Sequence, residues 1–250
     1  MMIFALPAFT FFLLLILEKI LPTIPQEHKY DIWDKFHNGV GLLMQGCVVP
    51  ALGYWLSVSL FPLAFHEYKG MIELGWLNCF LLNLIFIDFL YYWQHRAFHS
   101  FTCLWNLHYC HHASNRVDIW TTSRNSILIN FIFVYCLINP PLAFLCDSPE
   151  GFYYGAMVTA SLDVFRHTRL NLNKLLPRRF LQVISHIIIM PCQHHHHHRM
   201  SKVSVNLGAN FMIWDILFGT AQIDTKYPSA YGVIKAWHPL KQLLHPFIKR

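Results

Sequence analysis

Three groups of histidines in this chain have the spacing of metal ligands. They are His95-x-x-x-His99, His108-x-x-His111-His112 and, within the unbroken run from His194 to His198, His194-x-x-His197-His198. Residues three and four positions apart lie on one face of a helix, so each group can direct its imidazoles to one side. Imidazole suits iron, copper, nickel and zinc, and eight ring nitrogens are too many for one zinc ion but suit two metal ions. The pattern therefore predicts a metal site to which three short helical segments contribute.

The run of five histidines could also be an affinity tag. Tags lie at chain termini, however, whereas this run is internal and continues into sequence with the character of a folded chain. Two separate His-x-x-His-His matches in one chain also argue against chance. We therefore interpret the run as part of the metal site.

The elements that must position these histidines are apolar. Of the 250 residues, 55% are hydrophobic and only 13% are charged, a balance that a single water-soluble core cannot hide. The candidate transmembrane segments are Met1 to Leu17, Gly39 to Phe65, Leu74 to Trp93, Ile127 to Cys146 and Gly151 to Leu162. We expect Pro50 and Pro62 to bend or end the second stretch, and Pro140-Pro141 to interrupt the fourth. The sequence thus predicts a single integral membrane domain that covers residues 1–250.

Charge predicts the side of the membrane on which the site lies. The fourth and fifth stretches are joined by Asp147-Ser148-Pro149-Glu150, and a hairpin there lets all three histidine groups meet on one face. Segments 94–126 and 166–202, which carry the histidines, hold ten Lys and Arg residues and one acidic residue, Asp118. The positive-inside rule then places the site in the cytosol. The net charge of +6 has the same origin, so it gives no case for nucleic-acid binding.

The position and the ligand chemistry of the histidines narrow the function. None of the five apolar stretches contains a histidine, whereas a metal transporter needs ligands at mid-membrane depth. The groups contain no carboxylate, whereas a hydrolytic metal site usually mixes carboxylates with histidine. An all-imidazole site with two ions suits iron that activates dioxygen for attack on an unactivated C–H bond. The alternative is a metal-binding or metal-handling membrane protein without oxygenase activity, in which the five histidines would form a sensing or loading site.

Ordered motifs along the chain carry a family resemblance. They are Asp88-x-x-x-Tyr92-Trp93-x-His95-Arg96-x-x-His99, Leu104-Trp105-x-x-His108-x-x-His111-His112, Pro191-x-x-His194-x-x-His197-His198, Asn206-x-Gly208 and Trp214-Asp215-x-x-Phe218-Gly219-Thr220. In this order they resemble the fatty acid hydroxylase and sterol desaturase superfamily, whose members are membrane-bound histidine-box di-iron oxygenases. The resemblance implies an all-α integral membrane protein with about four to five transmembrane helices and a cytosolic, histidine-rich helical cap. It also implies a catalytic region at residues 88–220 and oxygen-dependent hydroxylation or desaturation of a lipid.

The same resemblance assigns ligands to two iron ions. It gives the ligand role to His95, His99, His108, His111, His112, His194, His197 and His198, and it adds His167 as a ninth ligand. Asn171, four residues after His167, would lie on the same helical face. His195 and His196 are extra to the family pattern, and on a helix they point away from the ligand face. We expect the remaining histidines to be structural or exposed: His28, His37, His66, His186, His238 and His245.

A few further residues are expected to support the site. Asp88 is either a helix-end aspartate near water or, as we prefer, the acceptor of the second N–H of a metal-bound histidine, and Asp215 is a candidate for the same role. The stripe Leu207, Phe211, Trp214 and Phe218 predicts an amphipathic helix lying on the membrane. Cys110 lies within the second histidine group, but the seven cysteines form no Cys-x-x-Cys pair, and we interpret them as apolar fillers.

These expectations combine into an iron-dependent lipid monooxygenase of lipid biosynthesis, with O2 as co-substrate and a lipid that enters from the bilayer. Two electrons must come from a separate reductase or small electron carrier, because the chain has no haem-attachment, flavin or nicotinamide, or ferredoxin motif. Sterol, fatty acyl, sphingoid, ether-lipid and carotenoid substrates all fit the sequence. A bacterial inner membrane and the endoplasmic reticulum fit it equally.

Overall fold

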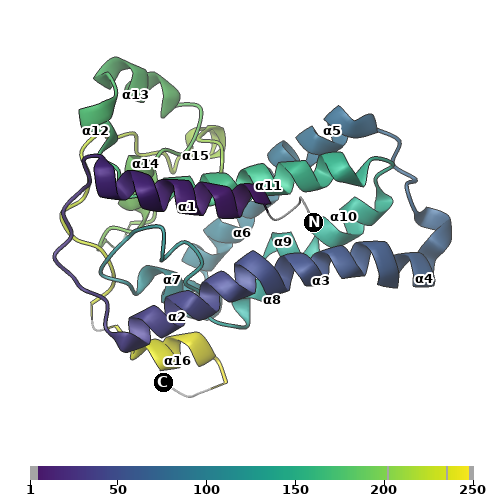
Figure 1. The fold of residues 1–250 in the computed structure, drawn as a ribbon, viewed down its shortest axis with the longest axis horizontal. Helices are drawn as coiled ribbons and strands as arrows, with labels where there is room; N and C mark the ends of the chain where they lie inside the picture. The colour runs from purple at the N-terminus through teal and green to yellow at the C-terminus, as the bar shows by residue number, and fades with distance from the viewer. Residues whose placement is uncertain (1–4, 202, 235, 248–250) are drawn as a thin grey trace.

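The described part of the chain is helical. The computed structural model describes residues 5–201, 203–234 and 236–247, and within these ranges the regular elements are helices, joined by loops with isolated β-bridges (Figure 1). The all-α prediction is confirmed for this part of the chain. Met1 to Phe4 of the first apolar stretch and Lys202 of the basic segment lie outside the described residues.

Two long helices form the apolar part of the structure. The first runs without a break from Ile32 to Tyr68 and contains α2 (Ile32–Leu43), α3 (Val49–Trp55) and α4 (Phe61–Phe65). The second runs from Gly75 to Ser100 and contains α5 (Gly75–Leu81) and α6 (Asp88–Ser100). At 37 and 26 residues, these are the two helices of the described chain that are long and apolar enough to cross a membrane. They support membrane association of the chain.

The long first helix does not end at either proline. Pro50 and Pro62 each follow a π-helical turn, over Met44–Val48 and Leu56–Leu60 respectively, and each lies in the first turn of the next α-helical segment. Proline has no backbone N–H to donate, and a first-turn position tolerates that loss. Of the two expected effects, a bend or an end, the structure excludes an end of the helix at these prolines, because the wider turns before them accommodate the missing N–H.

The fourth apolar stretch is not a single helix. It forms three short ones, α8 (Ile129–Ile132), α9 (Val134–Leu137) and α10 (Asn139–Leu145). The backbone is extended at Phe133, and the side chain of Gln94 bridges this break: its Nε2 donates to Ile132 O and its Oε1 accepts from Val134 N, both at 2.9 Å. Breaks at Phe133 and Ile138 thus replace the interruption expected at Pro140-Pro141, which lie in the first turn of α10.

Two further helices complete the bundle. Helix α11 (Pro149–Arg166) packs against α5 and against α1 (Ala5–Ile20), which crosses in front of it in Figure 1. The approach of α11 to α5 depends on Gly151, because a Cβ there would lie 2.2 Å from Trp76 O. Helix α11 ends directly before His167 and so delivers it to the end of the bundle where the other histidines lie.

A cap of short helices covers that end of the bundle. It consists of α7 (Thr102–His112), α12 (Leu172–Leu175), α13 (Arg178–Ile184), α14 (Pro191–His197), α15 (Ile213–Leu217) and α16 (Pro239–Leu244) (Figure 1). Arg124, which is fully buried in the loop after α7, binds Asp34 of α2 at 3.0 Å and Gln242 of α16 at 3.0 Å. This arginine joins the cap to the long helix.

Candidate metal centre

All nine predicted ligands converge at the junction of the bundle and the cap. Helix α6 presents two of them and α7 three, while α14 and its C-cap residue present three more and the residue after α11 the ninth. Eight are buried and His99 is partly buried. Their ring nitrogens fall into two groups, and within each group one nitrogen of every residue lies within 4.8 Å of the others.

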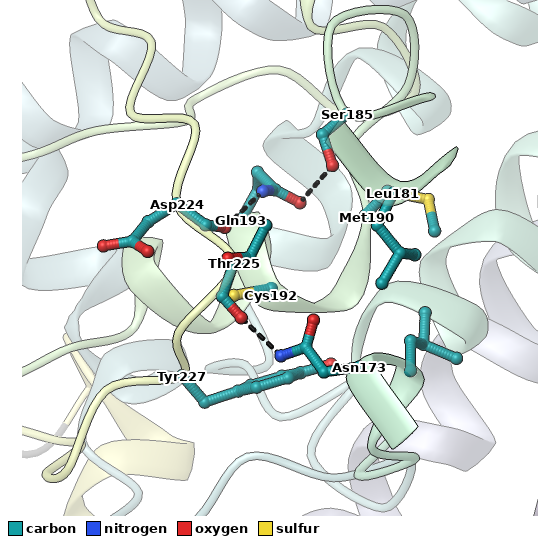
Figure 2. Close-up of a pocket in the computed structure, with 10 residues that line it drawn as sticks. Asn173, Leu181, Ser185, Met190, Cys192, Gln193, Asp224, Thr225 and Tyr227 are labelled. Carbon is teal, nitrogen blue, oxygen red and sulfur yellow. Dashed lines mark hydrogen bonds between the residues drawn. The ribbon is translucent and has the colours of Figure 1, made fainter. Parts of the chain in front are cut away.

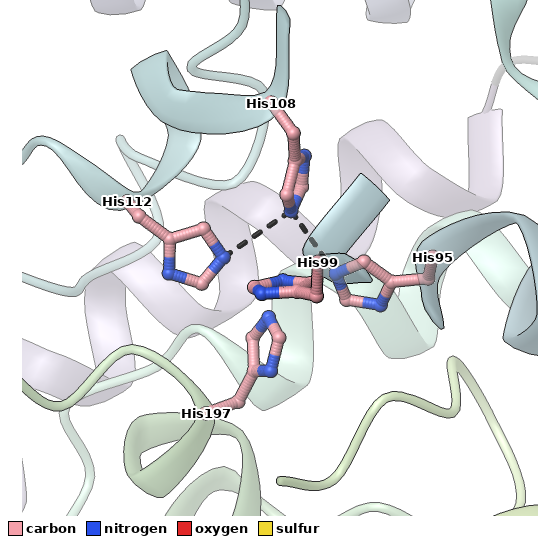
Figure 3. A group of neighbouring side chains, drawn as sticks. All are labelled: His95, His99, His108, His112 and His197. Carbon is pink, nitrogen blue, oxygen red and sulfur yellow. Dashed lines mark hydrogen bonds between the residues drawn. The ribbon is translucent and has the colours of Figure 1, made fainter. Parts of the chain in front are cut away.

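The larger group, here called group A, contains His95, His99, His108, His112 and His197 (Figure 3). The Nε2 atom of His108 lies 3.0 Å from that of His95 and 3.2 Å from that of His112. Within the described part of the chain, the buried Nε2 atoms of His99 and His197 have no hydrogen-bond partner. Five imidazoles from three separate segments therefore point their Nε2 atoms at one shared space.

The smaller group, here called group B, contains His111, His167, His194 and His198. The Nε2 atom of His194 lies 3.0 Å from that of His167 and 3.1 Å from that of His198. The two groups adjoin each other, since the ring of His198 in group B lies 4.6 Å from that of His112 in group A. Consecutive residues thus belong to different groups. His111 lies in group B and His112 in group A, while His197 lies in group A and His198 in group B.

The nitrogen geometry fits metal ions better than it fits hydrogen bonds. Two ligand nitrogens at right angles on an ion with bonds of about 2.1 Å lie about 3.0 Å apart. The Nε2 atoms of His108 and His194 each lie close to the Nε2 atoms of two other histidines. A neutral imidazole carries a single N–H, so hydrogen bonds between these nitrogens cannot satisfy all of them at once. Each group therefore has the donor set and the spacing that a bound metal ion requires, and group A also has two unpaired nitrogens.

Burial also holds these imidazoles in the neutral form that binds metal. It lowers the pKa of His111 to about 3 and that of His197 to about 4. Burial, together with neighbouring histidines, keeps four further pKa values well below their usual range, those of His108, His112, His194 and His198. Metal ligation needs deprotonated imidazole, so these shifts favour ligation at neutral pH.

Backbone carbonyls orient the rings. The Nδ1 atom of His95 bonds Leu207 O at 2.8 Å, that of His197 bonds Val205 O at 2.9 Å, and that of His167 bonds Asp163 O at 2.8 Å. A ring held at Nδ1 turns Nε2 toward the metal space, which is the usual role of the outer partner of a metal-bound histidine. No sequence motif marks these carbonyls, and residue-type reasoning did not identify them.

Two buried aspartates hold the loop that supplies two of these carbonyls. Asp215 accepts from Leu207 N at 2.6 Å, from Gly208 N at 2.8 Å and from the Thr220 hydroxyl at 2.6 Å. Gly208 is required there, because a Cβ would lie 2.7 Å from Phe211 O and 2.9 Å from the Asp215 carboxylate. Burial raises the pKa of Asp215, and the three hydrogen bonds oppose that rise.

The second aspartate, Asp88, acts on the same loop. It accepts from Asn210 N at 2.7 Å, from Phe211 N at 3.2 Å and from Trp214 Nε1 at 2.8 Å. Neither carboxylate bonds a histidine in these contacts, so the expectation that Asp88 and Asp215 accept directly from metal-bound rings is wrong. They act one step further out, by fixing the backbone whose carbonyls bind the rings.

This loop also replaces the predicted amphipathic helix. Only Ile213–Leu217 is helical, as α15, and Leu207 is buried in the loop. The apolar stripe over Leu207, Phe211, Trp214 and Phe218 does not form one helical face, because the two aspartates accept hydrogen bonds from the backbone N–H groups of residues 207, 208, 210 and 211.

The hydrogen bonds by which Asp215 and Asp88 hold this loop, here called the loop clamp, give a first testable result. Replacing Asp215 by alanine leaves two buried backbone N–H groups without an acceptor, and it frees the carbonyl that orients His95. We expect the affinity of group A for metal to fall by about 10–100-fold, the usual cost of losing an outer partner. Metal retention under increasing chelator concentration measures this. Asp224→Asn is the control, since Asp224 lies at the surface near His196 and does not contact the loop clamp.

The two extra histidines of the run lie outside both groups, as expected from helical geometry. His195 is fully buried, with Nδ1 2.8 Å from the Tyr231 hydroxyl and Nε2 3.1 Å from Thr168 O. His196 directs Nε2 to Lys226 O at 2.6 Å. Both therefore attach α14 to the segments around it.

A small pocket on the outer side of α14 shows the same attachment (Figure 2). Gln193 donates to Asp224 O at 2.7 Å and accepts from the Ser185 hydroxyl at 3.3 Å. The space that remains is about 10 Å³, which is no more than one water molecule fills. This pocket fixes α14 in place and is too small for a substrate.

Asn171 does not join the histidine groups in the expected way, and Cys110 lies outside them as expected. Asn171 does not share a helical face with His167, because α11 ends at Arg166 and α12 begins at Leu172. The Cys110 thiol donates to Gln242 O at 2.8 Å, and burial raises its pKa to about 12. A thiol with that pKa is not a ready metal ligand, in agreement with its interpretation as a buried filler.

A large cavity reaches both histidine groups. Its volume is about 470 Å³, and its wall includes His108 of group A together with His111 and His194 of group B. Apolar side chains from α1, α3 and α11 form much of the rest, among them Phe11, Phe12, Val49, Met157 and Val164. A cavity of this size and character suits a lipid chain.

The known proteins to which this chain is similar are hydroxylases and monooxygenases. The sequence profile of the fatty acid hydroxylase family matches residues 80–220, which is more than half of the chain. The chain is 28% identical over 240 residues to an alkylglycerol monooxygenase from Xenopus tropicalis, covering 92% of this chain and 49% of that protein. It is 27% identical over 164 residues to the alkylglycerol monooxygenase of Homo sapiens, covering 64% and 34%.

A bacterial lipid hydroxylase is also similar. The ornithine lipid hydroxylase of Rhizobium tropici is 28% identical over 142 residues, covering 56% of this chain and 40% of that protein. The chain thus spans about half, or less, of the length of these curated relatives. No solved structure shows a significant match to it.

Proposed function

The chain belongs to the fatty acid hydroxylase family, and we propose that it is an iron-dependent, O2-dependent monooxygenase that hydroxylates or desaturates a membrane lipid. The observation that carries this proposal is that one apolar cavity is lined by histidines of both groups. A lipid in that cavity would lie next to both metal positions. The relatives named as monooxygenases and hydroxylases of lipids support the same reaction class.

Group A would hold one iron ion and group B the other. Iron bound there would supply the activation of dioxygen that attack on a C–H bond needs. The residues of the chain do the rest: the carbonyls of Val205 and Leu207 orient His197 and His95, and the apolar wall of the cavity places the lipid chain and excludes water.

Hydroxylation consumes one O2, two electrons and two protons, and yields the hydroxylated lipid and water. Since the sequence contains no motif for a flavin, nicotinamide, haem or ferredoxin centre, the electrons are proposed to come from a separate reductase or small electron carrier.

The proposed setting is an integral membrane protein with its site on the cytosolic face. We propose about four to five transmembrane helices, of which Ile32–Tyr68 and Gly75–Ser100 would be two. Arg124 and Arg166 are buried in ion pairs, so they do not contribute to the exposed positive charge. Exposed residues of the cap such as Lys174, Arg178 and Arg179 therefore support the positive-inside argument. The host would be a bacterial inner membrane or the endoplasmic reticulum.

The test is a single-turnover reaction. The purified chain, loaded with iron and reduced chemically, would be exposed to isotopically labelled O2 in the presence of extracted membrane lipid. Hydroxylation is expected to place one labelled oxygen in a lipid product, whereas desaturation removes two hydrogens without adding label. A lipid pool that is unchanged by the iron-loaded, reduced chain would favour the metal-handling alternative.

A further inference from the structure

A buried arginine links the helix that leads to His167 with the loop that orients group A. Arg166 is the last residue of α11, and only 3% of it is exposed. Its Nη1 atom donates to Ala209 O at 2.6 Å, and its Nη2 atom pairs with Asp163 Oδ1 of α11 at 2.8 Å. One guanidinium group therefore binds α11 and the loop at the same time.

The two ends of this link lead to different metal groups. The residue after Arg166 is His167, which belongs to group B. On the other side, Ala209 lies two residues after Leu207, and Leu207 O holds the Nδ1 atom of His95 in group A at 2.8 Å. Arg166 thus connects a ligand of group B to the backbone that orients a ligand of group A.

A second contact joins the same two elements. The Nδ2 atom of Asn210 donates to the Thr159 hydroxyl of α11 at 2.8 Å, and both residues are buried. The Asp88 carboxylate of α6 accepts from Asn210 N at 2.7 Å, so the loop is also fixed from α6 at this point. The loop therefore follows the end of α11 through two adjacent residues, Ala209 and Asn210.

A neighbouring arginine has no such position. Arg169, three residues after Arg166, pairs with Glu18 of α1, with Nε 3.3 Å from Oε2. Its backbone N–H donates to Glu18 Oε1 at 2.8 Å, and its carbonyl accepts from Ile24 N at 2.8 Å. Within the described residues, these contacts join the segment after α11 to the first part of the chain and not to the loop.

We propose that Arg166 is a positioning residue that couples the two metal groups. When His167 ligates a metal ion, it fixes the end of α11, and with it the guanidinium that holds Ala209 O. The loop then keeps Leu207 O in place to orient His95. Coupling between two binding sites is reciprocal, so occupancy of either group raises the affinity of the other by the same factor. The inference rests on the proposed function, because it requires that both groups hold metal.

The test determines the coupling factor from metal binding alone. The full chain in lipid nanodiscs, without reductant, O2 or added substrate, would be titrated with Co2+ against a competing chelator, with occupancy followed by visible absorption. His167→Ala gives the association constant of group A alone, and His197→Ala gives that of group B alone. The product of the two association constants of the wild-type chain, divided by the product of these single-group constants, is the coupling factor.

The coupling factor of the wild-type chain should be about 5 to 150, the usual range for two linked sites. Arg166→Met, combined with the same two histidine substitutions, should reduce the factor to about one, the value for independent sites. Arg166→Lys keeps a cation that can donate a hydrogen bond, so it should retain more of the coupling than Arg166→Met does.

Two further variants make the test specific. Thr159→Val removes the hydroxyl that accepts from Asn210 and should lower the coupling factor by about twofold or more. It provides the test if Arg166→Met does not fold. Arg169→Met is the matched control, because it removes an arginine from the same region without breaking a contact to the loop, and it should keep the wild-type factor.

A wild-type coupling factor of one would overturn the proposal, and so would a factor that the substitutions at Arg166 and Thr159 leave unchanged. An equal fall of the factor in Arg169→Met would also overturn it, since any loosening near the end of α11 would then be sufficient. None of these outcomes depends on catalysis. A coupled chain that forms no lipid product would overturn the proposed function and leave this inference intact.

Discussion

Replacing His197 by alanine should abolish product formation, whereas replacing His195, two positions earlier in the same run, should not. The Nε2 atom of His197 has no hydrogen-bond partner among the described residues and points into group A, while both ring nitrogens of His195 are bonded outside the two groups. Loss of a metal ligand should cost more than the roughly 10–100-fold that loss of an outer partner costs. His195→Ala should instead lower the free energy of unfolding by about 1–3 kcal/mol, because Thr168 O and the Tyr231 hydroxyl lose a buried partner.

The measurement compares bound iron, product and thermal stability for single alanine variants at all five positions of the run. His194, His197 and His198 should lose metal and activity, while His195 and His196 should lose stability with metal retained. An equal loss of metal at all five positions would show that the run is an undifferentiated metal-binding tract, and the assignment of groups A and B would fail.

The second large effect is expected at His167, the residue after α11. Its Nε2 atom lies 3.0 Å from that of His194, and Asp163 O holds its Nδ1, so it has the same arrangement as the histidines of the three motifs. His167→Ala should release the ion of group B and reduce product formation to background, because group B would retain only three imidazoles.

His186 provides the matched control for this variant. It is an exposed histidine in the turn after α13, and its Nδ1 bonds Gln182 O of that helix. His186→Ala should keep wild-type metal content and activity. Full activity of His167→Ala with both ions retained would remove His167 from the ligand set and leave the other eight in place.

The histidines of groups A and B could be singled out from the sequence because helical spacing is a local property. His108, His111 and His112 share a helical face whatever surrounds α7, and residue type alone indicates metal binding. The division of these histidines into groups A and B could not be predicted from the sequence. His111 and His112 differ by one helical step, and which ion each would serve depends on how α11 and α14 approach α7, a tertiary arrangement that no local pattern encodes.

The supporting residues show the same limit. Asp88 and Asp215 stood out as carboxylates near the motifs, but their partners are backbone N–H groups of a loop, and the histidines bond carbonyls of that loop. Every residue carries a carbonyl, so Val205 and Leu207 have no distinguishing sequence signal. The break at Phe133 likewise depends on Gln94, which lies on another helix and replaces hydrogen bonds that local propensity assumes.

The central claim is that the chain holds two iron ions, one in each histidine group, and the metal content of the purified protein tests it most directly. Iron per chain would be determined by plasma emission spectrometry against amino-acid analysis, after anaerobic purification that retains metal. Two iron ions per chain are expected for the wild-type protein, and one for His167→Ala. A value of one or none in wild-type protein with all nine histidines intact would contradict the account.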